Sequence, residues 1–229
     1  YGKEAIYIPA DLNFRKQVEQ VVQKGKESFQ QITCLIHTAG IIQDEIFRKK
    51  KFETFEKILA PKVYGTLNLD QATKQEELKA FVLFSSLAAF GNAGQCDYSY
   101  ANDFLVRFGE QRNVLTQKGQ RSGKTIVMNW PLWSSGGMKT DNQTEALFQH
   151  FGMRSLDSDI GMEALNISIG NDVNQVVVAQ GIHKLIWKKL QSMFKLREDI
   201  KNQNQSRKVF IEVKHRFTKK IMEIMRILL

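Results

Sequence analysis

Cysteine and proline are both scarce in this sequence, with two cysteines and three prolines among 229 residues. Cys34 and Cys96 form no CxxC pair and no Cys/His cluster, which excludes a disulfide framework and a zinc finger and fits reduced thiols. The few prolines argue against a disordered linker protein. The remaining composition, 42% hydrophobic and 25% charged, is that of an ordinary globular protein. We therefore predict a globular protein of the cytoplasm.

Long apolar runs are also missing, and negative charge is in deficit. No stretch approaches the 18 or more residues that a membrane span needs, so no membrane partner is predicted. The net charge is +9, but residues 188–229 hold twelve Lys or Arg and only four Asp or Glu. The basicity therefore belongs to this tail. We interpret the tail as a solvated linker or helix face, rather than as a site for nucleic acid or an acidic protein.

Strand-like and helix-like segments alternate along the rest of the chain. Apolar residues spaced for one helical face predict helices, and short continuous apolar runs predict buried strands. The predicted helices span 14–29, 52–69 and 98–115, and the predicted strands span 5–9, 32–37, 80–84, 125–129 and 175–179. This alternation predicts an α/β fold, a Rossmann-like doubly wound parallel sheet with helices on both faces.

Polar or unusual segments follow three of the predicted strands, namely residues 37–40, 85–86 and 131–133. The carboxyl ends of parallel strands share one edge of a sheet, and that edge is where such folds bind ligands. A nucleotide-binding fold normally carries a glycine-rich phosphate turn, yet neither GxGxxG nor a Walker A sequence occurs in the chain. We therefore expect the first βαβ unit to lie before Tyr1.

Four segments resemble the ketoreductase domain of modular polyketide synthases, which belongs to the short-chain dehydrogenase/reductase superfamily. They are HTAG (37–40), PKVYGTLNL (61–69), FVLFSSLAAFGNAGQCDYSYANDFL (81–105) and NWPLWSSGGM (129–138). The Cys-Asp dipeptide before Tyr98, together with NWPLW, resembles the trans-acyltransferase type of synthase. Ordinary short-chain dehydrogenases carry Tyr-x-x-x-Lys, whereas here Asn102 follows Tyr98 and the lysine, Lys62, lies upstream. That exchange is similar to polyketide and fatty-acid synthase ketoreductases.

The resemblance implies that a reduced nicotinamide gives hydride to a ketone carbon while the protein protonates the oxygen. Tyr98 is then the proton donor, Lys62 its electrostatic partner and ribose contact, and a serine orients the carbonyl. Counting from Lys62 favours Ser86 and counting back from Tyr98 favours Ser85; we prefer Ser86. Asn102 holds either Lys62 or a relay water. A lysine cation about 4 Å away contributes about 4 kcal/mol at an effective dielectric near 20, which predicts a tyrosine pKa lowered by up to roughly three units.

The same resemblance implies NADPH as the cofactor and a β-ketoacyl thioester on an acyl carrier protein as the substrate. The implied cofactor contacts, besides Lys62 and Tyr98, are Asp11, Leu12, Thr38, Ala39, Gly40, Pro131 and Leu132. Other domains of the same synthase are the implied partners. Asp44 stands where the family carries the second Asp of Leu-Asp-Asp, which indicates a B-type product, the D-configured 3-hydroxyacyl thioester. No metal site is expected.

Each of these residues has an ordinary interpretation when it is taken alone. A tyrosine or lysine on a helix is commonplace, and a Ser-Ser pair or Asp11 often caps a helix. Two other functions stay open: a remnant that keeps the fold without turnover, and a free-standing dehydrogenase. We predict that residues 1–190 form the C-terminal part of a ketoreductase domain, inactive alone. Residues 191–229 form a basic linker or helix, or begin a carrier domain.

Overall fold

The computed structural model describes residues 5–92, 94–136 and 149–192. The chain divides into two units, residues 1–186 and 187–229. Residues 193–229 lie outside the described part of the chain, so the linker, helix or carrier segment predicted for 191–229 stays a prediction. No helix in the described ranges is long and apolar enough to cross a membrane.

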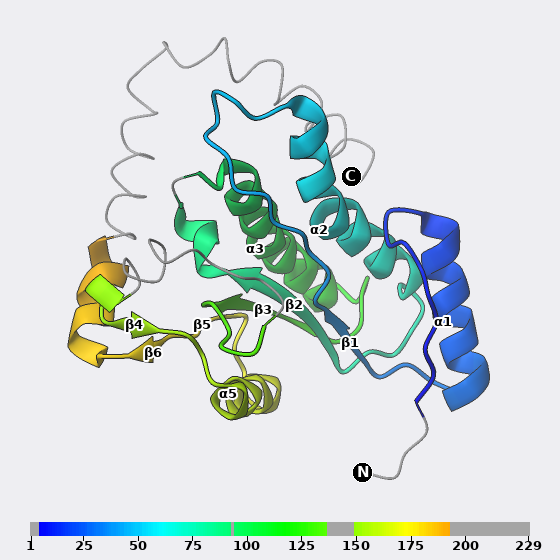
Figure 1. The fold of residues 1–229 in the computed structure, drawn as a ribbon. Coiled ribbons are helices and arrows are strands. Elements are labelled where there is room, and N and C mark those ends of the chain that lie inside the picture. Colours follow the sequence, from blue (N-terminus) through cyan, green and yellow to red (C-terminus); the bar gives the residue numbers. More distant parts are fainter. Residues whose placement is uncertain (1–4, 93, 137–148, 193–229) are drawn as a thin grey trace. The chain divides into compact units, whose positions relative to one another are not determined.

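Four parallel strands form the central sheet, in the order β1-β2-β3-β5 (Figure 1). They are β1 (Cys34–His37), β2 (Ala80–Ser86), β3 (Lys124–Trp130) and β5 (Gln175–Val177). Four of the five predicted strands are therefore confirmed, with ends that differ by at most two residues. Outside this sheet, β4 (Met153–Arg154) pairs antiparallel with β6 (Gln180–Gly181).

Helices cover both faces of the sheet. On one face lie α1 (Arg15–Phe29), α2 (Phe52–Ala72) and α3 (Cys96–Gln117), and on the other lies α5 (Ser158–Gly170) (Figure 1). Successive strand residues point to opposite faces. Phe81 and Leu83 accordingly pack in one core cluster with Leu105 of α3. Val82 and Ile126 pack in another with Leu165 of α5. The predicted doubly wound α/β architecture is confirmed, although α5 was not predicted.

Two expectations for the start of the chain are wrong. Residues 5–9 form no strand, because no strand of the described sheet lies beside them to share hydrogen bonds, and Tyr7 is 90% exposed. The strand predicted at 32–37 was expected to be buried. It is the outer strand of the described sheet, and Ile36 on it is 44% exposed.

A buried ion network joins α2 and α3 at the end remote from the carboxyl edge of the sheet. The Asp70 carboxylate accepts from Arg112 Nε at 2.8 Å and from Arg121 Nη2 at 2.9 Å, and the Arg112 side chain is only 1% exposed. The other Arg112 donors bind the Ser122 and Gly123 carbonyls and the Thr125 hydroxyl. The Asp70 carboxylate and these hydrogen bonds compensate the guanidinium charge, which is the condition under which a buried arginine is tolerated.

Replacing Arg112 by Met should leave the Asp70 carboxylate with Arg121 as its remaining ion-pair partner among the described residues. We expect the free energy of unfolding in urea to fall by about 3–5 kcal/mol, the usual consequence of breaking a buried ion pair. Arg107→Met is the control, because Arg107 pairs with Glu110 on the exposed side of the same helix. That variant should change the free energy by less than about 0.5 kcal/mol. Equal effects of the two variants would contradict this account.

Candidate active site

Three chain segments meet at the carboxyl edge of the sheet, as predicted. Ser86 at the end of β2 pairs in register with Trp130 at the end of β3, so Pro131 follows beside it. His37 at the end of β1 pairs with Leu83 of β2, so residues 38–40 leave the sheet at the same edge. The parallel arrangement therefore places the ends of β1, β2 and β3 around one site.

Lys62 reaches this edge from α2 and is almost completely buried. Its Nζ donates to the Phe84 carbonyl of β2 at 2.7 Å and lies 6.0 Å from the centre of the Tyr98 ring. Gly40 makes room for it, because a Cβ at Gly40 would lie 2.9 Å from Lys62 Cε. Burial lowers the pKa of Lys62 to about 8, so the ammonium form still prevails at neutral pH.

The Tyr98 side chain lies in an apolar cluster with Ile58 and Ala88. Burial raises the pKa of Tyr98 above its ordinary value of 10.0, and the hydrogen bond with the Ser86 side chain offsets this only in part. The prediction that a lysine cation lowers this pKa is therefore wrong in its direction, because desolvation of the phenolate dominates. The phenol keeps its proton at neutral pH, which is the form that a proton donor needs.

The two serines of β2 have different surroundings. The Ser86 side chain is hydrogen-bonded with Tyr98, and its Oγ accepts from the Ala88 amide at 3.1 Å. Ser85 is buried; its hydroxyl donates to the Asn102 carbonyl at 3.1 Å and accepts from Asn129 at 3.0 Å. Ser86 therefore lies with the phenol, while Ser85 ties β2 to α3 and β3. This arrangement supports the preference for Ser86, whose catalytic role stays a prediction.

Asn102 is completely buried one helical turn after Tyr98. Its Nδ2 donates to the Tyr98 carbonyl at 2.7 Å, whereas its Oδ1 is buried and has no hydrogen-bond partner among the described residues. Lys62 donates to Phe84, so the direct Lys62–Asn102 hydrogen bond, one of the two predicted roles, is not formed. A buried amide oxygen without a partner fits the other role, which is to hold a water.

Asp44 lies on the segment between β1 and α2, close to the phenol. The Gln95 side chain donates to both its carboxylate oxygens, at 2.9 and 3.0 Å. Burial is the main cause that raises the pKa of Tyr98, and the negative charge of Asp44 raises it further. Asp44 therefore lies near enough to the phenol to affect the pKa of Tyr98.

The remaining predicted cofactor residues lie on two other segments. Leu12 packs on α2, where its carbonyl accepts a hydrogen bond from Asn68 and its Cβ faces Gly65. Asp11 precedes it, and its carboxylate accepts a hydrogen bond from the Asn13 amide. Pro131 and Leu132 follow β3, and the Leu132 carbonyl accepts from Leu156. The carboxyl edge of the sheet, where Lys62 and Tyr98 meet the end of β2, fits the nicotinamide end of a dinucleotide, whereas the sequence holds no glycine-rich turn for its phosphates. The described residues hold no cluster of metal-ligating side chains.

His37 contacts the backbone of α2 next to Lys62, and its ring is neutral. Its Nε2 lies 3.1 Å from the carbonyl oxygen of Pro61, the residue before Lys62, and a neutral Nε2–H donates there. Burial is the main cause that lowers the pKa of His37 to about 4, and the positive charge of Lys62 lowers it further. The ring thus holds α2 without adding a second cation beside Lys62.

Comparison with known proteins identifies the family of this chain. The sequence profile of the KR domain family matches residues 1–135. Polyketide synthase PksL of Bacillus subtilis (strain 168) is 40% identical over 183 residues, which are 79% of this chain and 4% of PksL. The chain belongs to the KR domain family. Polyketide synthase PksN of the same organism is 36% identical over 182 residues, which are 79% of this chain and 3% of PksN.

Solved structures agree with this assignment. A ketoreductase domain from the bacillaene assembly line has a TM-score of 0.75 at 36% identity, over 79% of this KR chain and 44% of that chain. A ketoreductase from the macrolactin assembly line has a TM-score of 0.72 at 36% identity, over 82% of this chain and 36% of that chain. KR domains are oxidoreductases that bind nicotinamide cofactors. This KR chain spans only 4% of the length of PksL and 3% of the length of PksN.

Three residues beside the site were not identified as part of it from the sequence. Lys50 forms an ion pair with Asp97, the residue before Tyr98, and Gln95 binds Asp44. Lys50 belongs to a run of three lysines, which is typical of a solvated surface. Asp97 was noted only as part of the dipeptide before Tyr98. The KR resemblance therefore named candidate reacting groups but not the neighbouring residues that contact them.

The buried His37 should make this KR domain sensitive to acid. Its pKa is about 4 in the folded chain and 6.5 in the unfolded chain, so the unfolded chain binds the proton first as the pH falls. Stability is therefore lost from pH 6.5 down to about 4, by about 3 kcal/mol from this group. His37→Gln, which keeps an N–H donor but does not titrate, should be less acid-sensitive than the parent. Urea unfolding at several pH values measures the difference.

His183→Gln serves as the control, because His183 is exposed. It should follow the parent at every pH, and carboxylates elsewhere titrate equally in all three proteins. If His37→Gln loses stability between pH 6.5 and 4 as steeply as the parent does, His37 is not the group responsible.

Proposed function

We propose that this KR chain carries the proton-donating half of an active site that reduces a β-ketoacyl thioester to the 3-hydroxyacyl thioester. The cofactor is NADPH, and the substrate is held on the phosphopantetheine of an acyl carrier protein within the same synthase. The observation that carries the proposal is the cluster of Tyr98, Ser86 and Lys62 at the end of β2. Family membership supports the reaction class, and the geometry of this cluster supports the proposed roles.

The three side chains divide the work at the ketone oxygen. The dinucleotide, when bound, supplies the hydride to the β-carbon, and negative charge then develops on the oxygen. Tyr98, whose raised pKa keeps its proton in place, donates that proton. Ser86, hydrogen-bonded to the same phenol, orients the oxygen. The Lys62 ammonium, 6.0 Å from the ring centre, stabilises the tyrosinate that remains.

Relatives support the substrate class. The curated relatives are polyketide synthases, and the solved neighbours come from the bacillaene and macrolactin assembly lines. Asp44 beside the phenol supports the B-type, D-configured product. The alternative is a domain that keeps the fold without turnover. It is favoured by one observation, the lack of a glycine-rich phosphate turn in these 229 residues.

A hybrid protein separates the two functions. In it, this chain replaces the matching 44% of the bacillaene ketoreductase, whose remaining part supplies the rest of that domain. We expect the 229-residue chain alone to bind NADPH weakly and the hybrid to oxidise NADPH with an N-acetylcysteamine β-ketothioester. NADH in place of NADPH tests the cofactor, and a carrier-bound substrate tests the partner. A folded hybrid that binds NADPH but does not turn over would favour the structural alternative.

Tyr98→Phe in the hybrid removes only the phenolic oxygen. Because general acid catalysis contributes roughly 10²–10⁴-fold, we expect kcat to fall at least about 100-fold while NADPH binding changes little. Tyr100→Phe is the matched control, since Tyr100 lies two residues along the same helix and is exposed. It should retain the parent rate. A Tyr98→Phe protein as fast as the parent would exclude Tyr98 as the donor.

The serine pair gives a second test of the site. Ser86→Ala should lower kcat by about 10²–10³-fold, as the loss of one donor to a developing oxyanion does, with little change in stability. Ser85→Ala removes two buried hydrogen bonds and should lower the free energy of unfolding by about 1–3 kcal/mol, with a smaller effect on kcat. NADPH absorbance and urea unfolding measure both effects, and the reverse pattern would assign catalysis to Ser85.

A further inference from the structure

The segment of residues 41–50, here called the 41–50 loop, lies against the first turn of α3. The Glu45 amide donates to the Gly94 carbonyl at 3.1 Å, and Gln95 donates to Asp44. Ile42 packs on the apolar cluster that contains Tyr98. The hydrogen bonds of Gln95 to Asp44 are exposed to solvent, so water competes for them.

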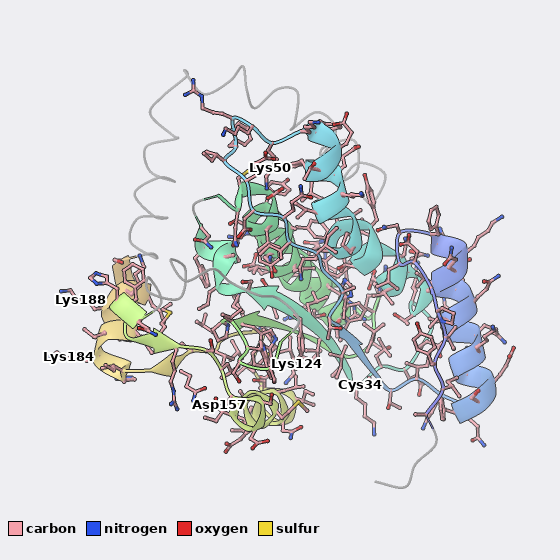
Figure 2. The ribbon with its side chains drawn as sticks, viewed as in Figure 1. Cys34, Lys50, Lys124, Asp157, Lys184 and Lys188 are labelled. Atoms are coloured by element: carbon pink, nitrogen blue, oxygen red, sulfur yellow. The ribbon has the colours of Figure 1, made fainter. Side chains whose placement is uncertain are left out.

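One contact between the loop and α3 differs because it is buried. Lys50 Nζ lies 2.5 Å from Asp97 Oδ2, and the two side chains are 1% and 0% exposed. The same ammonium donates to the Gln43 carbonyl at 2.9 Å, and Asp97 Oδ1 accepts from the Tyr98 amide at 2.8 Å. Figure 2 labels Lys50 on the loop before α2, above the start of α3. The Lys50 ammonium therefore links the carbonyl of Gln43, the residue before Asp44, to the carboxylate of Asp97, the residue before Tyr98.

The energetics of burial argue that this pair does more than stabilise the fold. Taking two charges out of water costs about as much as their attraction returns, so apolar side chains of similar size would stabilise the fold as well or better. What a buried pair with further hydrogen bonds does supply is a fixed geometry, because charge-assisted hydrogen bonds are short and directional. Here the further hydrogen bonds of the pair hold Gln43, beside Asp44, and the backbone amide of Tyr98.

We propose that Lys50 and Asp97 are positioning residues for the reduction. Their ion pair holds the 41–50 loop on the first turn of α3 and so sets the place of Asp44 relative to the Tyr98 phenol. This inference rests on the proposed function. A ketone gives one enantiomer only if it meets the hydride and the phenol in one orientation. The pair therefore affects the configuration of the product and the turnover rate together.

The experiment compares variants that remove the pair with controls that do not. Lys50→Met removes the ammonium, Asp97→Asn keeps the shape and the Oδ1 acceptor, and the double variant leaves no buried charge unpaired. Arg112→Met is the matched control, because it breaks another buried pair on α3, about 20 Å along the helix from Tyr98. Lys49→Met replaces the neighbouring exposed lysine.

Hydrogen–deuterium exchange of the 229-residue chain is the first measurement and needs no activity. In Lys50→Met and in the double variant, exchange should rise in peptides covering the 41–50 loop and residues 96–100, relative to peptides of β2. Arg112→Met should raise exchange without this local preference, and Lys49→Met should match the parent. If the loop and the first turn of α3 do not both loosen in the two pair variants, the proposed link is overturned.

Product configuration in the active hybrid is the second measurement. We expect Lys50→Met and the double variant to lower kcat by about 100-fold with KM changed only a few-fold, and to shift the enantiomer ratio at least several-fold. Arg112→Met lowers stability but should keep the parent ratio, because its folded molecules are unchanged at the site. A parent-like ratio in the double variant overturns the positioning role. A parent hybrid without turnover refutes the proposed function instead, and the exchange result then still decides whether the pair holds the loop.

Discussion

The burial of the Lys62 ammonium at the end of β2 is the constraint on which the rest of the site depends. A cation that has lost water needs a fixed partner, and the Phe84 carbonyl provides it. Gly40 leaves space at the far end of the side chain, and His37 holds the carbonyl of the residue before it. Burial, with a further contribution from the charge of Lys62, lowers the pKa of His37 to about 4 and keeps the ring neutral, so His37 adds no second cation beside Lys62.

The surroundings of Tyr98 bear on its proposed role as the proton donor. Its pKa is raised chiefly by burial, so the ground state is the protonated phenol. In the proposed reduction that proton would leave only when a stronger base forms beside it, and the alkoxide left by hydride addition would be such a base. The apolar cluster around the ring and the nearby ammonium therefore act at different moments. The first keeps the proton in the ground state, and the second stabilises the charge that its departure leaves.

Two buried ion networks lie on α3, and their positions distinguish them. The Asp70, Arg112 and Arg121 network joins α2 to α3 and the turn before β3, far from the carboxyl edge. The Lys50–Asp97 pair lies beside Tyr98 and reaches the loop that carries Asp44. Both meet the same electrostatic requirement, which is that a buried charge has charged or hydrogen-bonding partners. Because the Lys50–Asp97 pair lies beside the proposed proton donor, we propose for it a positioning role that the Asp70 network does not have.

The sequence by itself determined the four strands of the central sheet, the three helices α1 to α3 and the candidate site residues, because apolar periodicity is local and the motifs around Lys62, Ser86 and Tyr98 are continuous. Residues 5–9 were assigned a strand wrongly, since a strand depends on a neighbour that a local pattern does not reveal. Only the tertiary structure decided which of two adjacent serines lies with the phenol, which of three lysines is buried with Asp97, and the direction of the Tyr98 pKa. Each depends on which groups lose water and which partners replace it, and those partners come from segments far apart in the chain.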